Sequence, residues 1–269
     1  MTTAMTFSFL GAFVAIAVWS MLKDRRDMAK LKAAANTAAR QRIMIRWMVE
    51  SWVAFGLVAV AGLALTGNWA RLVEPVLRLP GLGRDTFDTG SLAAGIAVGL
   101  VILIAGQVIA ARRKARRITP AEFEKMKQRY LLAGDVAALI PRNAAERRVG
   151  AGLSLAAGVS EELMFRALLP ALIFDACGGR FAWWAVGVSV VLFGLMHAYQ
   201  GIGGVIGTAF AGAVFMAVYL VSGNIFGSML LHFLVDLRSM VLTSWVFETA
   251  EKTISRIQAG ADATNQSHP

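Results

Sequence analysis

Residues 150–175 read GAGLSLAAGVSEELMFRALLPALIFD, an apolar run with Glu161, Glu162 and Arg166 near its middle. A helix needs about 20 largely apolar residues to cross the hydrocarbon core of a bilayer. A charged group at that depth costs several kcal/mol unless it is paired or faces a cavity. The stretch therefore predicts a membrane-spanning helix whose charged side chains have a structural or functional partner.

The composition supports the same class of protein for the whole chain. Its 269 residues are 57% hydrophobic, and the mean hydropathy is +0.60. Soluble domains carry about 25% charged residues, whereas this chain carries 16%, grouped between apolar runs. The net charge of +10 fits basic membrane loops better than a nucleic-acid partner. Cys177 is the only cysteine, so no internal disulfide can form.

The apolar runs predict an all-α, polytopic transmembrane bundle of about seven spans. Eight Lys or Arg residues lie in the segment between the first two runs, and eleven lie in residues 112–148. Because basic loops mark the cytoplasmic side, seven spans place the N-terminus outside and the C-terminus inside. The predicted spans are residues 6–22, 48–66, 91–111, 150–175, 182–199, 203–221 and 225–246.

Two further features are predicted from local patterns. Thr119 followed by Pro120 is typical of a helix start, and the segment to Ile140 mixes charged and apolar residues, so we expect an amphipathic helix along the membrane surface. The pairs Gly95/Gly99 and Gly203/Gly207 predict close approach of neighbouring helices.

The charged residues of the fourth span suggest a division of roles. Glu162 and Arg166 are four residues apart, on one helical face and within ion-pairing reach. Glu161 is rotated by about 100° from them, so it is left facing the bundle interior as a poorly solvated carboxylate. Such a carboxylate is suited to act as a general base near neutral pH. A buried ion-pair network that only fixes helix packing is the alternative reading.

Two other spans carry histidines. His197 ends the fifth span, and His232 lies four residues before Asp236 in the seventh. The His232–Asp236 spacing has three possible meanings. The carboxylate could orient the imidazole, the two side chains could bind a metal, or the pair could only stabilise the helix.

Taken together, these segments resemble a known family. Glu-Glu-x-x-x-Arg at 161–166, Phe-x-x-x-His at 193–197 and His-x-x-x-Asp at 232–236, in this order on successive apolar runs, are similar to the three motifs of the CAAX-protease and bacteriocin-processing family (CPBP, or Abi). This family includes the type II CAAX prenyl endopeptidase, whose third motif ends in asparagine where this chain has Asp236.

The resemblance implies an intramembrane endopeptidase with its active site between the C-terminal helices. Glu161 would activate water, His197 would position that water, and His232 with Asp236 would correspond to the pair that stabilises the oxyanion, while Glu162 and Arg166 would shape the site. An ionised Asp236 cannot donate a hydrogen bond to an oxyanion as asparagine can. It must therefore be protonated or act by keeping His232 cationic.

The resemblance, which covers about residues 145–246, and the pattern of apolar and charged segments together divide the chain. Residues 1–140 would form N-terminal transmembrane helices and basic cytoplasmic loops, residues 141–246 the catalytic helical core, and residues 247–269 a cytoplasmic polar tail that is disordered from residue 259. Together they make one integral membrane domain. The expected partners are a lipid bilayer and a peptide or membrane-protein substrate, in the plasma (inner) membrane of a bacterium, and no nucleic acid.

Metal use and the competing functions stay open at this point. A metal-independent mechanism is favoured because no His-Glu-x-x-His occurs, and the alternative is Zn²⁺ bound by Glu161, His197 and His232. The other functional readings are a transporter with buried coupling charges, or an inactive immunity or scaffold protein of the membrane.

Overall fold

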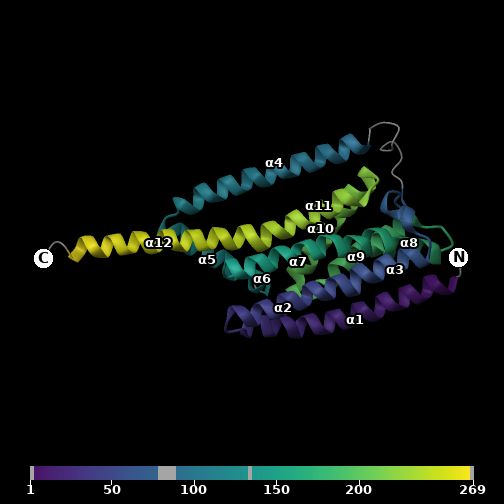
Figure 1. Ribbon diagram of the computed structural model, residues 1–269, viewed down its shortest axis with the longest axis horizontal. Helices are drawn as coiled ribbons and strands as arrows, with labels where there is room; N and C mark the ends of the chain where they lie inside the picture. The colour runs from purple at the N-terminus through teal and green to yellow at the C-terminus, as the bar shows by residue number, and fades with distance from the viewer. Residues whose placement is uncertain (1–2, 78–88, 133–134, 267–269) are drawn as a thin grey trace.

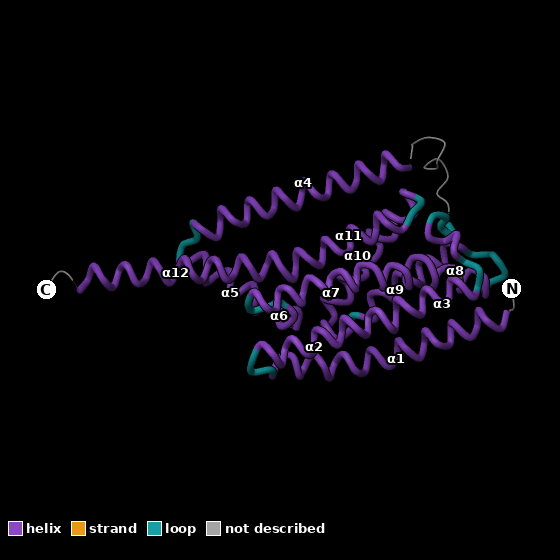
Figure 2. The backbone as a smooth tube through the Cα atoms, viewed as in Figure 1, coloured by secondary structure: helices purple, strands orange, loops and turns teal. Residues whose placement is uncertain are grey.

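Every regular element in the computed structural model, which describes residues 3–77, 89–132 and 135–266, is helical, as predicted. Figure 2 shows these helices joined by short loops. The elements are α1 (Thr3–Ala33), α2 (Thr37–Glu50), η1 (Ser51–Leu57), α3 (Val58–Leu65), η2 (Trp69–Leu72), α4 (Thr89–Arg116), α5 (Pro120–Leu132), α6 (Asp135–Leu139), α7 (Ala144–Glu162), η3 (Leu163–Leu168), α8 (Leu169–Ala176), α9 (Ala182–Met196), η4 (Ala198–Gln200), α10 (Gly201–Ser222), α11 (Ile225–Leu237), η5 (Arg238–Leu242) and α12 (Thr243–Gln266).

The helices form an elongated bundle whose two termini lie at opposite ends of its long axis (Figure 1). The α1–α2 turn and the C-terminal end of α4 both lie toward the end where the C-terminus emerges. The two basic segments of the sequence are therefore on the same side of the bundle, as the orientation argument requires. Which side faces the cytoplasm stays a prediction.

Four helices of the described chain are long and apolar enough to cross a membrane. They are Thr3–Ala33, Thr37–Leu65, Ala198–Ser222 and Ile225–Gly260, and the apolar helix Ala182–Met196 is shorter. The predicted fourth span is present as the uninterrupted series α7, η3 and α8, but it carries the charges that set it apart from an ordinary span. The count of seven spans stays a prediction.

Three of the long helices contain a π-helical segment, and all three segments help to line one cavity. The segments are η1 between α2 and α3, η3 between α7 and α8, and η5 between α11 and α12. A π-helical turn is rare and is often found at functional sites, because the extra residue per turn changes the direction in which the following side chains point. No local pattern in the sequence predicts these π-helical segments.

A buried ion pair attaches the α1–α2 hairpin to the start of α7. Arg40 is 0% exposed, and its Nε lies 2.9 Å from Oε2 of Glu146, which is also 0% exposed. The same guanidinium donates to the carbonyl oxygens of Leu31, Ala138 and Ile140 at 2.8–3.2 Å. Two segments separated by 106 residues are thereby fixed together next to the cavity.

Close helix packing occurs at glycines other than the predicted ones. No described atom lies within 4 Å of a Cβ built at Gly95, Gly99, Gly203 or Gly207, so the prediction of close approach there was wrong. At Gly158 on α7, a Cβ would lie 2.8 Å from the backbone nitrogen of Phe233 on α11. This contact brings the helix that carries Glu161 against the helix that carries His232.

The second basic loop begins as predicted but then differs. Thr119 Oγ1 and N both donate to Glu122 Oε2 at 2.9 Å, a capping box at the start of α5. These two hydrogen bonds hold the pKa of the Glu122 carboxyl below its usual range. The helix ends at Leu132, and α6 follows from Asp135. Phe123 of α5 packs on Ala250 and Ile254 of α12, so the apolar face is covered by protein rather than lying wholly on the membrane surface.

The predicted C-terminal tail is helical over most of its length. Helix α12 continues to Gln266, so the expectation of disorder from residue 259 was wrong for residues 259–266. Helix α5 packs on Ala250 and Ile254 of α12, whereas residues 255–260 are exposed, and the end of α12 projects beyond α4 and α5 (Figure 1). The polar composition there therefore belongs to an exposed helix.

Candidate active site

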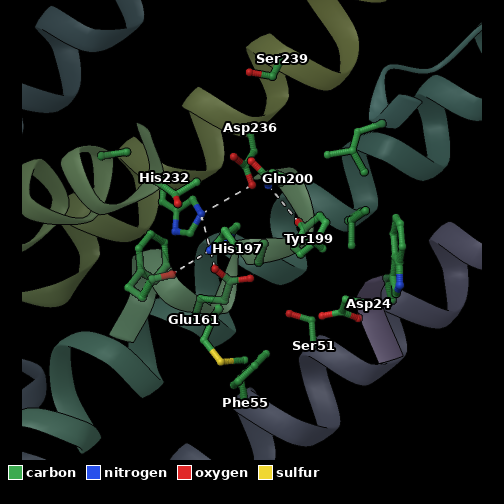
Figure 3. Close-up of a pocket in the computed structure, with 18 of the residues that line it drawn as sticks. Asp24, Ser51, Phe55, Glu161, His197, Tyr199, Gln200, His232, Asp236 and Ser239 are labelled. Atoms are coloured by element: carbon green, nitrogen blue, oxygen red, sulfur yellow. Dashed lines mark hydrogen bonds and ion pairs between the residues drawn. The ribbon is translucent and has the colours of Figure 1, made fainter. Parts of the chain in front are cut away.

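A cavity of about 480 Å³ lies inside the bundle, where helices from both halves of the chain meet. Glu161, His197, His232 and Asp236 all line it, and Figure 3 shows their side chains converging on one region. The structure therefore brings together the four residues to which the motif resemblance gave catalytic roles. The facing wall is formed by side chains of α1, α2 and η1, among them Lys23, Asp24, Trp47, Glu50, Ser51 and Phe55.

Glu162 and Arg166 form the buried ion pair that their spacing predicted. Arg166 Nη2 lies 3.1 Å from Glu162 Oε1, and both side chains are 0% exposed. The guanidinium carbon also lies 4.5 Å from the ring centroid of Phe193 and 5.8 Å from that of Phe215. Cation–π contacts of this kind are strongest where water is excluded, so Arg166 is fixed by the rings as well as by Glu162.

Glu161 has the opposite environment, although it is the adjacent residue. Its side chain is 15% exposed and lines the cavity, and Oε2 is buried without a hydrogen-bond partner among the described residues. His232 Nε2 lies 4.0 Å from this Oε2. A buried, unpartnered carboxylate oxygen is costly unless it serves a purpose. This carboxylate is available to a water molecule or a substrate in the cavity.

His232 is held by contacts on both faces and at both nitrogens. Its ring stacks on Phe215, with centroids 4.7 Å apart, and meets Phe193 edge-on at 5.8 Å. Nδ1 lies 2.9 Å from Glu162 Oε1, so the carboxylate accepts the Nδ1 hydrogen. Nε2 then points into the cavity, 4.0 Å from Glu161 and 3.6 Å from Asp236 Oδ2.

The bond between Glu162 and His232 was not anticipated from the sequence. The two residues are 70 positions apart, and their contact depends on how α11 is rotated against α7. From spacing along each helix, Arg166 is the expected partner of Glu162, and Asp236 is the expected partner of His232. In the structure Glu162 joins both pairs into one network, which fixes the imidazole with Nε2 toward the cavity.

His197 caps the C-terminal end of α9, and the hydrogen bond it makes there defines its chemistry. Its Nδ1 lies 2.8 Å from the carbonyl oxygen of Phe193. A carbonyl oxygen can only accept, so Nδ1 carries the hydrogen, and in the neutral ring Nε2 has a free lone pair. The ring also lies 5.9 Å from that of Tyr199.

The wall supplied by the N-terminal helices was missed by sequence reasoning. Lys23 Nζ lies 2.9 Å from Asp24 Oδ1 and also contacts Glu50 across the hairpin. These residues belong to a stretch that was interpreted only as a signal for membrane orientation. Trp47 and Tyr199, whose ring centroids are 6.5 Å apart, continue the same wall. The available signal for this wall was that charged residues occur on both helices of the hairpin, at Lys23 and Asp24 on α1 and at Glu50 on α2.

The side chains of the site include the three ligands of the predicted zinc alternative, Glu161, His197 and His232. Within residues 3–77, 89–132 and 135–266, no group of three or more His, Cys, Asp or Glu side chains is arranged to hold a metal ion. Nδ1 of His197 meets a carbonyl and Nδ1 of His232 meets Glu162, which leaves Nε2 of each ring as the atom that could bind a metal. The alternative of a zinc ion on Glu161, His197 and His232 stays a prediction.

These features define a helical membrane protein with a carboxylate–histidine cavity inside its bundle. Residues 147–238 match the family model described as Rce1-like, type II CAAX prenyl endopeptidase Rce1-like. The match confirms the family resemblance predicted from the three motifs. It begins within α7, ends at the first residue of η5 and includes every predicted site residue.

The apolar helices and the family match together support a multi-pass membrane protein, in which residues 147–238 are similar to a family of proteases. The helices α1–α6 lie outside the matched range. No curated protein and no solved structure matches the chain.

Proposed function

We propose that this protein is an intramembrane endopeptidase in which Glu161 activates a water molecule for attack on a peptide bond. One observation carries the proposal: Glu161 Oε2 is buried, has no hydrogen-bond partner among the described residues, and lies on the wall of a 480 Å³ cavity beside His232. A general base must reach the proton that it abstracts. A water molecule in the cavity beside Glu161 meets this condition.

The reaction follows from the donors and acceptors around that position. The water oxygen attacks the carbonyl carbon while one water proton passes to Glu161. The free lone pair of His197 Nε2 accepts a hydrogen bond from the second water hydrogen, which orients the water oxygen for attack. The carbonyl oxygen becomes an oxyanion within reach of an N–H on His232 Nε2. Preorganised donors of this kind are often the largest catalytic contribution in acyl transfer. As the C–N bond breaks, Glu161 returns its proton to the leaving amine.

Glu162, Arg166 and Asp236 act through His232. Glu162 accepts from Nδ1 and so directs Nε2 toward the cavity, and Arg166 keeps Glu162 ionised and in place. Asp236 lies 3.6 Å from Nε2. An ionised Asp236 is only an acceptor, so its role is to favour a hydrogen on Nε2 by its negative charge. Each of these steps uses side chains of the protein alone.

The proposal is tested by comparing membranes from cells that produce the wild type, Glu161→Gln, or the control Glu251→Gln. Glu251 is exposed on α12, far along the helix from the cavity. Quantitative proteomics should find peptide ends that depend on the wild type and on Glu251→Gln but are lost with Glu161→Gln, since a general base contributes about 10²–10⁴-fold to rate. The thermal unfolding of all three purified proteins should be closely similar.

The same experiment separates the proposal from the alternatives. An immunity protein, a scaffold or a transporter would leave the set of peptide ends unchanged between wild type and Glu161→Gln. Peptide ends that persist at wild-type levels with a well-folded Glu161→Gln protein would contradict the glutamate mechanism.

A further inference from the structure

A second groove lies on the other face of the helix that carries His232 and Asp236. It encloses about 260 Å³ between α4 and the series α11, η5 and α12, and these helices run side by side (Figure 1). Most of its walls are aliphatic, formed by Ile104 and Val108 of α4 and by Leu234, Leu237 and Val241 opposite them. The charged residues that line the groove are Arg112 and Arg238.

Neither arginine is neutralised within the described part of the chain. The Arg112 guanidinium lies over the ring of Trp245, 5.3 Å from its centroid, and no carboxylate is within ion-pairing distance. Arg238 donates from Nε to Gln107 Oε1 at 2.7 Å. This hydrogen bond uses one of its five N–H groups, so the two terminal amino groups stay available. Two exposed, pre-positioned guanidinium groups therefore share a groove that has no acidic residue in its walls.

The position of these groups along the bundle matches the edge of a bilayer. Arg112 directly follows the apolar run of α4 and begins a basic sequence, RRKARR, at 112–117. Trp245 stands near the end of the apolar part of its helix, and tryptophan is enriched at the membrane–water interface. Arg238 is two helical turns deeper, about 10 Å at 1.5 Å per residue. Its long side chain can reach toward the same level.

We propose that this groove binds an anionic phospholipid, with an acyl chain along the aliphatic walls and the phosphate on Arg112 and Arg238. A neutral lipid would leave two positive charges without a counterion. A free phosphate would leave the aliphatic walls empty. Basic pockets between transmembrane helices are known to bind acidic headgroups at the cytoplasmic leaflet, and this groove lies on the basic side of the bundle. A bound lipid ties α4 to the helix that carries His232.

The test uses the full-length protein, purified in detergent and freed of lipid. The probes are phosphatidylglycerol and phosphatidylcholine with the same acyl chains, and the readouts are retention in native mass spectrometry and the thermal unfolding temperature. Phosphatidylglycerol should be retained and should raise the unfolding temperature more than phosphatidylcholine. In Arg112→Gln/Arg238→Gln its affinity should fall about thirtyfold, taking about 1 kcal/mol for each arginine and 1.4 kcal/mol for each factor of ten.

Two controls make the result specific to the groove. Arg113→Gln/Arg116→Gln removes the same charge from exposed positions of the same helix that do not line the groove, so phosphatidylglycerol binding should be unchanged. Val108→Trp fills the groove while keeping both arginines, and it should abolish the preference for phosphatidylglycerol even if the double arginine variant does not fold.

Three outcomes would overturn the proposal. One is an equal response to the two lipids. Another is an equal loss of binding in the control and in the groove variant. The last is stabilisation by water-soluble glycerol phosphate as strong as that by the lipid, which would indicate a phosphate site without an acyl chain. None of these readouts depends on proteolysis, so they separate this proposal from the proposed function.

Discussion

Replacing Arg166 with methionine is expected to destabilise the fold strongly, because it leaves the charge of Glu162 buried without its cation. Both side chains are 0% exposed, and their charged atoms lie 3.1 Å apart. Removing one partner of a buried pair typically costs about 3–5 kcal/mol. Methionine fills much of the volume beside Phe193 and Phe215, so the loss reports mainly the unpaired charge rather than a cavity.

A second variant separates the charge from the rest of the network. Glu162→Gln/Arg166→Met removes both charges but keeps a side-chain oxygen that accepts from His232 Nδ1. Replacing a buried ion pair with neutral groups of similar volume is often neutral or stabilising. We therefore expect the double variant to regain most of the stability lost in Arg166→Met, while its activity stays low because Glu162 no longer holds a charge beside His232.

The measurement is the free energy of unfolding in mixed detergent micelles, together with the thermal unfolding temperature. His197→Ala serves as the comparison, since His197 lines the cavity and forms no ion pair with another described residue. It should lower turnover with a much smaller change in unfolding free energy. The reasoning is refuted if Arg166→Met unfolds like His197→Ala, or if the double variant is as unstable as Arg166→Met.

The remaining predictions concern the hairpin tether, the orientation and the metal. Arg40→Met should cost about 3–5 kcal/mol by the same argument, measured by unfolding, and Glu146→Gln/Arg40→Met should recover part of it; no loss would mean that the hairpin is held by other contacts. In a Cys177→Ala background, cysteines at Ala35 and Arg180 should react with an impermeant reagent from opposite sides of the membrane, and reaction from one side would contradict the predicted span count. Chelators should leave proteolysis unchanged once effects on the substrate are controlled, whereas one equivalent of zinc per chain, lost when either cavity histidine becomes alanine, would contradict the metal-free mechanism.

The parts of the site that the sequence predicted are those that depend on one helix at a time. Spacing along a helix fixed the Glu162–Arg166 pair and the relation of His232 to Asp236, because residues four apart share a face. Each of these charged residues lies in a predicted membrane span, where lipid does not solvate a charge, and this marks it as a candidate site residue. The all-α fold followed from the same composition.

The parts that were missed depend on how helices are placed against one another. The Glu162–His232 hydrogen bond needs α7 and α11 to meet at Gly158. No second glycine lies four residues before or after Gly158, so it forms no GxxxG pattern. The tether of Arg40 to Glu146 spans 106 residues. The packing of α5 on Ala250 and Ile254 of α12 also joins segments that are far apart in the sequence. None of these contacts leaves a periodic signal in one segment, so local patterns could not reveal them.

Glu161 and Glu162 show how neighbouring, chemically identical residues take different roles. A helical step of about 100° turns one carboxylate toward Arg166 and His232 and the other toward the cavity. Glu162 has its charge balanced by Arg166 and one oxygen engaged by Nδ1 of His232, which leaves it little tendency to take a proton from water. Glu161 has an unpartnered oxygen and a cavity in front of it. Exchanging the two environments would require rotating α7 against α11 at Gly158, where a Cβ would already be 2.8 Å from the neighbouring backbone. The close contact at that glycine is therefore what assigns the proposed base to Glu161 rather than to Glu162.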